Sequence, residues 1–149
     1  MITVGYSTRE SKPEFIEYLK KSSGFKKLEV IEKVNNGEKS LPQVYNEIIS
    51  EAKTDIVLLC HDDIYFDTPA WYSKLLKHFE KTDFGIIGMA GTTSMPAGGM
   101  WWENRKKMVG IVNHEKDGKK YQFRAGANYV GSGTYIPGFV QRHITGKIR

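Results

Sequence analysis

The 149-residue sequence contains one cysteine, Cys60, and no long apolar run. A single cysteine excludes an internal disulfide framework and a cysteine-based zinc cluster, and it is typical of a reducing compartment. The longest strand-like apolar stretch covers residues 56–60, far short of the roughly 18–20 residues that a membrane span needs. Since the N-terminus also lacks the basic and then apolar layout of a secretion signal, we expect a cytoplasmic protein.

Acidic residues are scarce in the last third of the chain. Residues 104–149 carry 10 Lys and Arg but only 2 Asp and Glu, a net charge of +8, whereas residues 1–103 carry 12 and 15, a net charge of −3. A basic end of this kind is typical of proteins that bind nucleic acid, an anionic membrane surface or a phosphorylated substrate. It is equally typical of a solvated, poorly ordered terminus. The charge therefore leaves these alternatives open.

Strand and helix signals alternate over the first ninety residues. Ser11 followed by Pro13 and Glu14 predicts a helix start, and Ser40 with Gln43 predicts a second one through a capping box. The apolar run before His61 predicts a central strand that is buried on both faces. We expect strands at residues 2–7, 28–34, 56–60 and 84–90, and helices that begin near Ser11, Ser40 and Asp67.

This βαβαβαβ order predicts an α/β fold, a three-layer α/β/α sandwich with a mostly parallel sheet. Ligands of such sheets bind beyond the carboxyl ends of the strands. We assign residues 1–92 to this core. Residues 93–149 are expected to form an irregular, basic segment of the same domain that contains Gly and Trp, with one irregular hairpin within residues 107–130.

The triplet His61-Asp62-Asp63 ends the buried strand. Adjacent carboxylates at the edge of an apolar run are unfavourable unless solvent, a cation or hydrogen-bond donors stabilise them. Alternation along an extended chain places His61 and Asp63 on one side and Asp62 on the other. Carboxylate oxygens suit Mg²⁺ or Mn²⁺, which substrate phosphates can also bind. The structural alternative is that Asp62 or Asp63 caps a turn before Tyr65.

The triplet stands inside SLPQVYNEIISEAKTDIVLLCHDDIYFDTPAWYSKLL, residues 40–76. This segment resembles the glycosyltransferase-like proteins of family 2, of the GT-A (nucleotide-diphospho-sugar transferase) type. Within them it is most similar to the small StrF-like branch, named for the StrF domain of streptomycin biosynthesis. The shared features are a helix after Ser-Leu-Pro, a strand that ends in His-Asp-Asp-Ile-Tyr-Phe, and a helix that opens with Pro-x-Trp. The resemblance is good over residues 1–92 and weak beyond them.

The resemblance implies roles for the triplet. In the family, an acidic motif after this strand binds the ribose and the divalent ion of a nucleotide-sugar. Carried over position by position, it implies Asp63 as a ligand of Mn²⁺ or Mg²⁺, helped by Asp62. His61 takes the first acidic place, where the wider superfamily has Asp, and together with Asp62 it would contact the nucleotide-sugar.

The resemblance also implies a nucleotide pocket between the loops after the first two strands. Ordinary turn chemistry is the alternative interpretation of both loops. The residues expected to line this pocket are Ser7, Thr8 and Arg9 in the first loop and Asn35 and Asn36 in the second.

Two features beyond residue 92 concern the acceptor. Trp101 and Trp102 follow the Gly98-Gly99 pair, and exposed tryptophans on a loop suit stacking on a sugar or a hydrophobic acceptor. Burial against the sheet edge is the structural alternative.

An inverting sugar transferase usually needs a carboxylate base for the acceptor hydroxyl, and Glu103 is a weak candidate. The length is short for a complete GT-A domain, which leaves a truncated C-terminus open.

The function expected first is transfer of a sugar from a nucleotide-diphosphate donor to a hydroxyl of a sugar or lipid-linked acceptor, with help from a divalent metal. Peripheral contact with a membrane is compatible with this function. The alternative is a catalytically incomplete module of the same fold that binds nucleotide or carbohydrate. A basic nucleic-acid-binding protein is less favoured, because the basic end lacks a recognisable motif and its aromatic residues are not interleaved with basic ones. We therefore expect no nucleic acid as partner.

Overall fold

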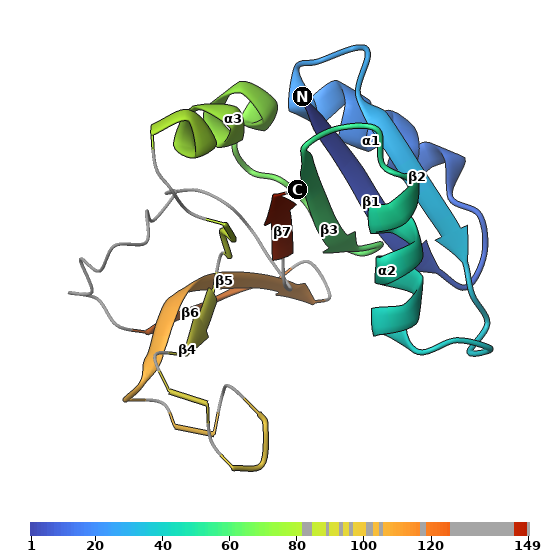
Figure 1. The fold of residues 1–149 in the computed structure, drawn as a ribbon. Coiled ribbons are helices and arrows are strands. Elements are labelled where there is room, and N and C mark those ends of the chain that lie inside the picture. Colours follow the sequence, from blue (N-terminus) through green and yellow to red (C-terminus); the bar gives the residue numbers. More distant parts are fainter. Residues whose placement is uncertain are drawn as a thin grey trace.

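The computed structural model combines an α/β/α sandwich with a small antiparallel sheet (Figure 1). The helices are α1 (Pro13–Ser23), α2 (Leu41–Glu51) and α3 (Trp71–Lys81). The strands are β1 (Ile2–Thr8), β2 (Glu29–Val34), β3 (Ile56–His61), β4 (Ala90–Thr92), β5 (Met108–Lys116), β6 (Lys119–Ala125) and β7 (Thr145–Ile148). The structure describes residues 1–81, 85–88, 90–92, 94–95, 97–100, 103–104, 106–116, 119–125 and 145–148.

The larger sheet has the order β2-β1-β3-β7. Strand β1 runs parallel to both β2 and β3, and β7 runs antiparallel to β3. Thr8 is the register partner of Val34, and Ser7 is the partner of His61. The first three strands therefore end at the same edge of the sheet. We call this the carboxyl edge: residues 7–12, 34–40 and 61–63.

Helices cover both faces of this sheet, which confirms the three-layer prediction. On one face, α1 and α3 pack over β1 and β3, where Tyr6, Leu58 and Trp71 are buried. On the other face, α2 packs with Ile48 against Val57. The residues of β3 thus have apolar partners on both sides, which explains why the run predicted as a central strand shows no polar alternation.

Strand β1 allows a very close approach of α2 at Gly5. A Cβ atom at this position would lie 2.1 Å from Cγ2 of Ile48, a side chain with no exposed surface. Because Ile48 is β-branched and fully enclosed, it has little freedom to move away. Glycine is therefore required here by the spacing of helix and strand.

The prediction of a fourth strand of the parallel sheet at residues 84–90 is wrong. Strand β4 pairs antiparallel with β5 and belongs to the smaller sheet, whose order is β4-β5-β6. Strand β7 is the other neighbour of β3. Within the described part of the predicted strand, Ile87 is buried but Ile86 is 66% exposed. Apolar composition indicated a strand, but it does not specify which strand becomes the partner.

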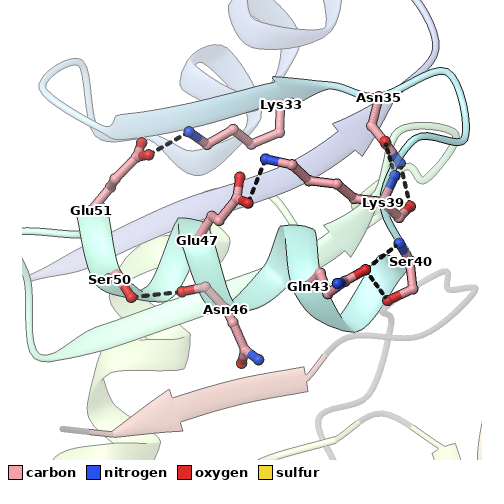
Figure 2. A network of polar contacts seen from close by, with 9 residues as sticks. All are labelled: Lys33, Asn35, Lys39, Ser40, Gln43, Asn46, Glu47, Ser50 and Glu51. Carbon is pink, nitrogen blue, oxygen red and sulfur yellow. Dashed lines mark hydrogen bonds and ion pairs between the residues drawn. The ribbon is translucent and has the colours of Figure 1, made fainter.

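The beginnings of the first two helices differ in how well they follow the sequence signals. The capping box at Ser40 is present as predicted: the Ser40 N–H donates to Oε1 of Gln43 at 2.8 Å (Figure 2). Helix α1 instead has Lys12 as its N-cap, because the hydroxyl of Ser11 donates to Oε1 of Glu32 at 2.6 Å. The predicted serine cap of α1 is therefore wrong.

The hairpin expected within residues 107–130 is confirmed as the antiparallel pair β5–β6. Its strands pair continuously from Gly110 with Ala125 to Lys116 with Lys119, so it is longer and more regular than expected. The division of the domain at residue 92 stays a prediction. In the part of the chain that the structure describes, no helix is long and apolar enough to cross a membrane.

Candidate functional site

Asp62 binds two donors at the carboxyl edge. Its Oδ2 accepts a hydrogen bond from Nζ of Lys12 at 2.6 Å and another from Oγ1 of Thr8 at 2.8 Å. Burial alone would raise the pKa of Asp62, but the hydrogen bonds from Lys12 and Thr8 outweigh it and lower the pKa below its ordinary value. The hydrogen bond to Asp62 in turn raises the pKa of Lys12. The pair is therefore ionised around neutral pH.

A second carboxylate, Glu32 of β2, fixes the loop that follows β1. It accepts hydrogen bonds from the hydroxyls of Tyr6 and Ser11, each at 2.6 Å, and from the backbone N–H of Lys12 at 2.8 Å. Burial raises the pKa of Glu32, but the bonds from Ser11 and Tyr6 outweigh it and leave the pKa below the ordinary value of 4.5. Residues 11 and 12 are thus tied to β2 through one ionised side chain.

Glu32 is expected to make stability depend on pH. A carboxylate whose pKa is lowered in the folded state stabilises the fold above its unfolded-state pKa, and this contribution is lost as the pH falls through the folded-state value. We expect Glu32→Gln to lower the free energy of unfolding by about 1 kcal/mol at pH 7. As the pH falls from neutral to below 4.5, the variant should also lose less stability than wild type. Urea unfolding at several pH values measures both effects.

Glu17→Gln is the matched control, because it removes the same charge from an exposed position on α1. This variant should follow the wild-type pH profile. If Glu32→Gln and Glu17→Gln have the same profile, Glu32 does not contribute the predicted pH dependence.

Asn35 shapes the loop after β2. Its backbone N–H donates to the carbonyl of Thr8 at 2.8 Å, which places this loop beside the loop after β1. Its side chain makes two 3.0 Å hydrogen bonds with the backbone of Lys39, as Figure 2 shows. Asn36 is exposed, and its N–H donates to Glu38 at 2.7 Å. The side chain of Asn35 therefore has a turn-forming role in this structure.

The predicted pocket residues divide between the two faces of the sheet. Gly5 faces α2, and alternate residues of a strand share a face, so Ser7 lies on the α2 side together with its register partner His61. Both are partly buried. Thr8 and Asp62 lie on the α1 side, where they bond to each other. The structure thus brings together Thr8 and Asp62, and separately Ser7 and His61.

Arg9 and Asp63 lie exposed at the carboxyl edge. Among the described residues, no group of three or more His, Cys, Asp or Glu is arranged to hold a metal ion. Oδ2 of Asp62 accepts two hydrogen bonds. Asp63 is exposed, and its carboxylate is of the hard-donor type that Mg²⁺ and Mn²⁺ prefer. One such ligand fits these ions when phosphate oxygens and water supply the others.

Tyr45 attaches α2 to the end of β3. Its hydroxyl donates to the carbonyl of Cys60 at 3.2 Å, and burial raises the pKa of Tyr45 to about 12. The Cys60 thiol is fully buried, which raises its pKa and leaves it in the neutral, unreactive form. Cys60 is thus a core residue, in agreement with its place on an apolar strand.

The acceptor-side predictions concern Trp101, Trp102 and Glu103. Trp101 and Trp102 lie outside the described residues. Glu103 is exposed, and its carboxylate packs beside Gly98, where an added Cβ would lie 2.5 Å from its Oε1. Among the described contacts, Glu103 is not joined to Asp62.

Sequence reasoning missed Lys12 and Glu32. Lys12 lies within the pattern that was interpreted as a helix start, and Glu32 was one of several charged residues in an amphipathic strand. The available signal was position: a charged residue near the carboxyl end of a predicted parallel strand, or in the loop that follows it, lies where such sheets bind ligands. Lys12 and Glu32 meet this criterion for β1 and β2.

Comparison with known proteins identifies a family for this chain. A model of the Glycosyltransferase like family matches residues 10–136. The match includes the carboxyl-edge residues from Glu10 onward, and it extends well past residue 92, where the resemblance had been weak. No curated protein matches the chain significantly. The α/β/α architecture agrees with a GT-A-like fold. Because the family model covers most of the sequence, the chain belongs to the Glycosyltransferase like family.

Proposed function

We propose that the carboxyl edge binds a nucleotide-diphosphate sugar and that the protein transfers the sugar to a hydroxyl of a sugar or lipid-linked acceptor. The observation that carries this proposal is the placement of Asp62 and Asp63 at the end of β3, beside the loops after β1 and β2, in a chain of this family. Ligands of parallel sheets bind at such an edge. Membership of the StrF-like branch and a cytoplasmic location are part of the proposal.

The proposed reaction assigns separate tasks to the residues of the site. The acceptor oxygen attacks the anomeric carbon of the donor, and the bond from that carbon to the diphosphate breaks with its electron pair on the diphosphate. Asp63 would hold Mn²⁺ or Mg²⁺, which stabilises the charge on the leaving diphosphate when bound. His61, Asp62, Ser7, Thr8 and Arg9 would contact the nucleotide-sugar, and the Asn35-Asn36 loop would form the other wall of its pocket.

The acceptor hydroxyl must lose its proton to a base. Glu103 is the residue we propose for this task, because it is an exposed carboxylate directly after the two tryptophans that we propose as the acceptor loop. Trp101 and Trp102 would stack on the sugar or hydrophobic part of the acceptor. This acceptor-side assignment is independent of donor binding.

Calorimetry with UDP, GDP and TDP, each with and without Mn²⁺, tests donor binding. We expect one nucleotide to bind, and Mn²⁺ to increase its affinity. Binding to none of the three under either condition would contradict the proposed function. Incubation with the matching nucleotide-sugars then tests turnover. If the nucleotide binds but no sugar is hydrolysed or transferred, the protein is a binding module of the same fold.

A further inference from the structure

Lys12 connects two parts of the carboxyl edge that lie far apart in the sequence. It is the N-cap of α1, and its Nζ lies 2.6 Å from Oδ2 of Asp62, which follows β3. Thr8 donates to the same oxygen. The side chains of Lys12 and Asp62 are 29% and 25% exposed. The ammonium group is therefore held in one place, on a side chain that stays partly accessible from solvent.

Helix stability does not explain a lysine at this position. The N-terminus of a helix carries partial positive charge, so a cation there is unfavourable by about 0.3–1 kcal/mol. A partly exposed ion pair contributes about 0–1 kcal/mol in the other direction. The two effects are of similar size, so the pair with Asp62 adds little net stability to α1.

The charges around Lys12 are mostly negative. Its hydrogen bond to Asp62 raises its pKa most, and the charges of Asp63 and Glu10 raise it further. Three carboxylates thus act on this one ammonium group. Like charges repel, so a diphosphate that approaches this edge needs a cation to receive it.

We propose that Lys12 contacts the diphosphate of the donor, and that Asp62 positions Lys12 rather than binding the metal ion. This inference rests on the proposed function. Glu32 fixes the backbone N–H of Lys12, and Asp62 fixes its ammonium group, so the residue is ordered before the donor binds. An ammonium group has three donors. It can therefore bind a phosphate oxygen without leaving Asp62.

The test compares nucleoside diphosphates with nucleosides. Calorimetry with Mn²⁺ present measures binding of UDP, GDP and TDP, and of uridine, guanosine and thymidine. For the diphosphate that wild type prefers, Lys12→Gln should weaken binding about tenfold, since one charge-assisted contact is lost. Binding of the nucleoside should stay within about twofold, and Lys12→Arg should retain most of the diphosphate affinity.

Lys53→Gln is the matched control. Lys53 is an exposed lysine shortly before β3, at the end of the sheet opposite to the carboxyl edge. The variant removes the same charge away from the site, so nucleotide affinity should not change. Thermal unfolding of each variant confirms that it is folded.

Three outcomes would overturn the proposal. If Lys12→Gln binds the diphosphate as wild type does, Lys12 does not contact it, while the proposed function stands. An equal loss of nucleoside and diphosphate affinity would show that Lys12 only shapes the loop. If wild type binds no nucleotide at all, the proposed function fails and Lys12 loses its role with it.

The role of Asp62 has its own readout. Asp62→Asn should keep the increase in affinity that Mn²⁺ causes, because Asp63 is the proposed metal ligand. The same variant should lose part of the diphosphate affinity, because Lys12 is less firmly held. Loss of the Mn²⁺ response in Asp62→Asn would show that Asp62 itself binds the metal ion and would overturn this part of the proposal.

Discussion

Gly5→Ala is expected to lower the free energy of unfolding by about 3 kcal/mol, the upper end of the usual range for overpacked cores. The added Cβ would lie 2.1 Å from Cγ2 of Ile48 and 3.3 Å from its Cβ. Ile48 is fully buried and its branched side chain is stiff, so α2 must move away from β1 to accept the methyl group. Urea unfolding followed by circular dichroism measures the loss.

Two further variants separate this clash from a general intolerance of alanine. Around Gly85 an added Cβ would meet no atom within 4 Å, so Gly85→Ala should change stability by no more than about 0.5 kcal/mol. In an Ile48→Ala background, Gly5→Ala should be neutral or stabilising, because its methyl group fills the space left by Ile48. A full loss of stability in that background would contradict the proposed clash.

Asp63→Ala is expected to abolish the Mn²⁺ dependence of nucleotide binding and to weaken binding by about 100-fold, or about 2.8 kcal/mol. The exposed Asp63 carboxylate is the proposed metal ligand, and without it the ion is held only by phosphate oxygens and water. Calorimetry with and without Mn²⁺ measures the loss directly.

Asp55→Ala is the control for this prediction. Asp55 is an exposed aspartate just before β3, at the opposite end of the same strand, so its removal changes the net charge equally but not the carboxyl edge. This variant should bind nucleotide as wild type does. If Asp63→Ala still shows the full Mn²⁺ response, Asp63 is not the metal ligand.

The local elements could be predicted because their signals are local. The capping box joins Ser40 to Gln43, three residues away. The apolar run of β3 indicates burial, because each apolar residue in it is itself buried. The order of strands and helices then limits the architecture to a parallel sheet with helices on both faces. The triplet His61-Asp62-Asp63 could be placed at the carboxyl edge by the same reasoning.

What could not be predicted depends on contacts between distant segments. Lys12 and Asp62 are 50 positions apart, and nothing in the pattern around Lys12 shows that its side chain reaches the residue after β3. Ser11 looked like a helix cap because Glu32, which accepts the hydrogen bond from its hydroxyl, lies on β2, 21 positions further along the chain. Strand β4 likewise pairs with β5, and the sequence of β4 alone does not determine which strand it pairs with.

The most direct test of a donor site at the carboxyl edge is to map nucleotide binding by NMR. Backbone amide shifts of the ¹⁵N-labelled protein are recorded while the nucleoside diphosphate that binds in calorimetry is added with Mg²⁺. We expect the largest shifts at residues 7–12, 35–37 and 61–63. Shifts confined to the β5–β6 hairpin, with the carboxyl edge unchanged, would contradict a donor site at this edge.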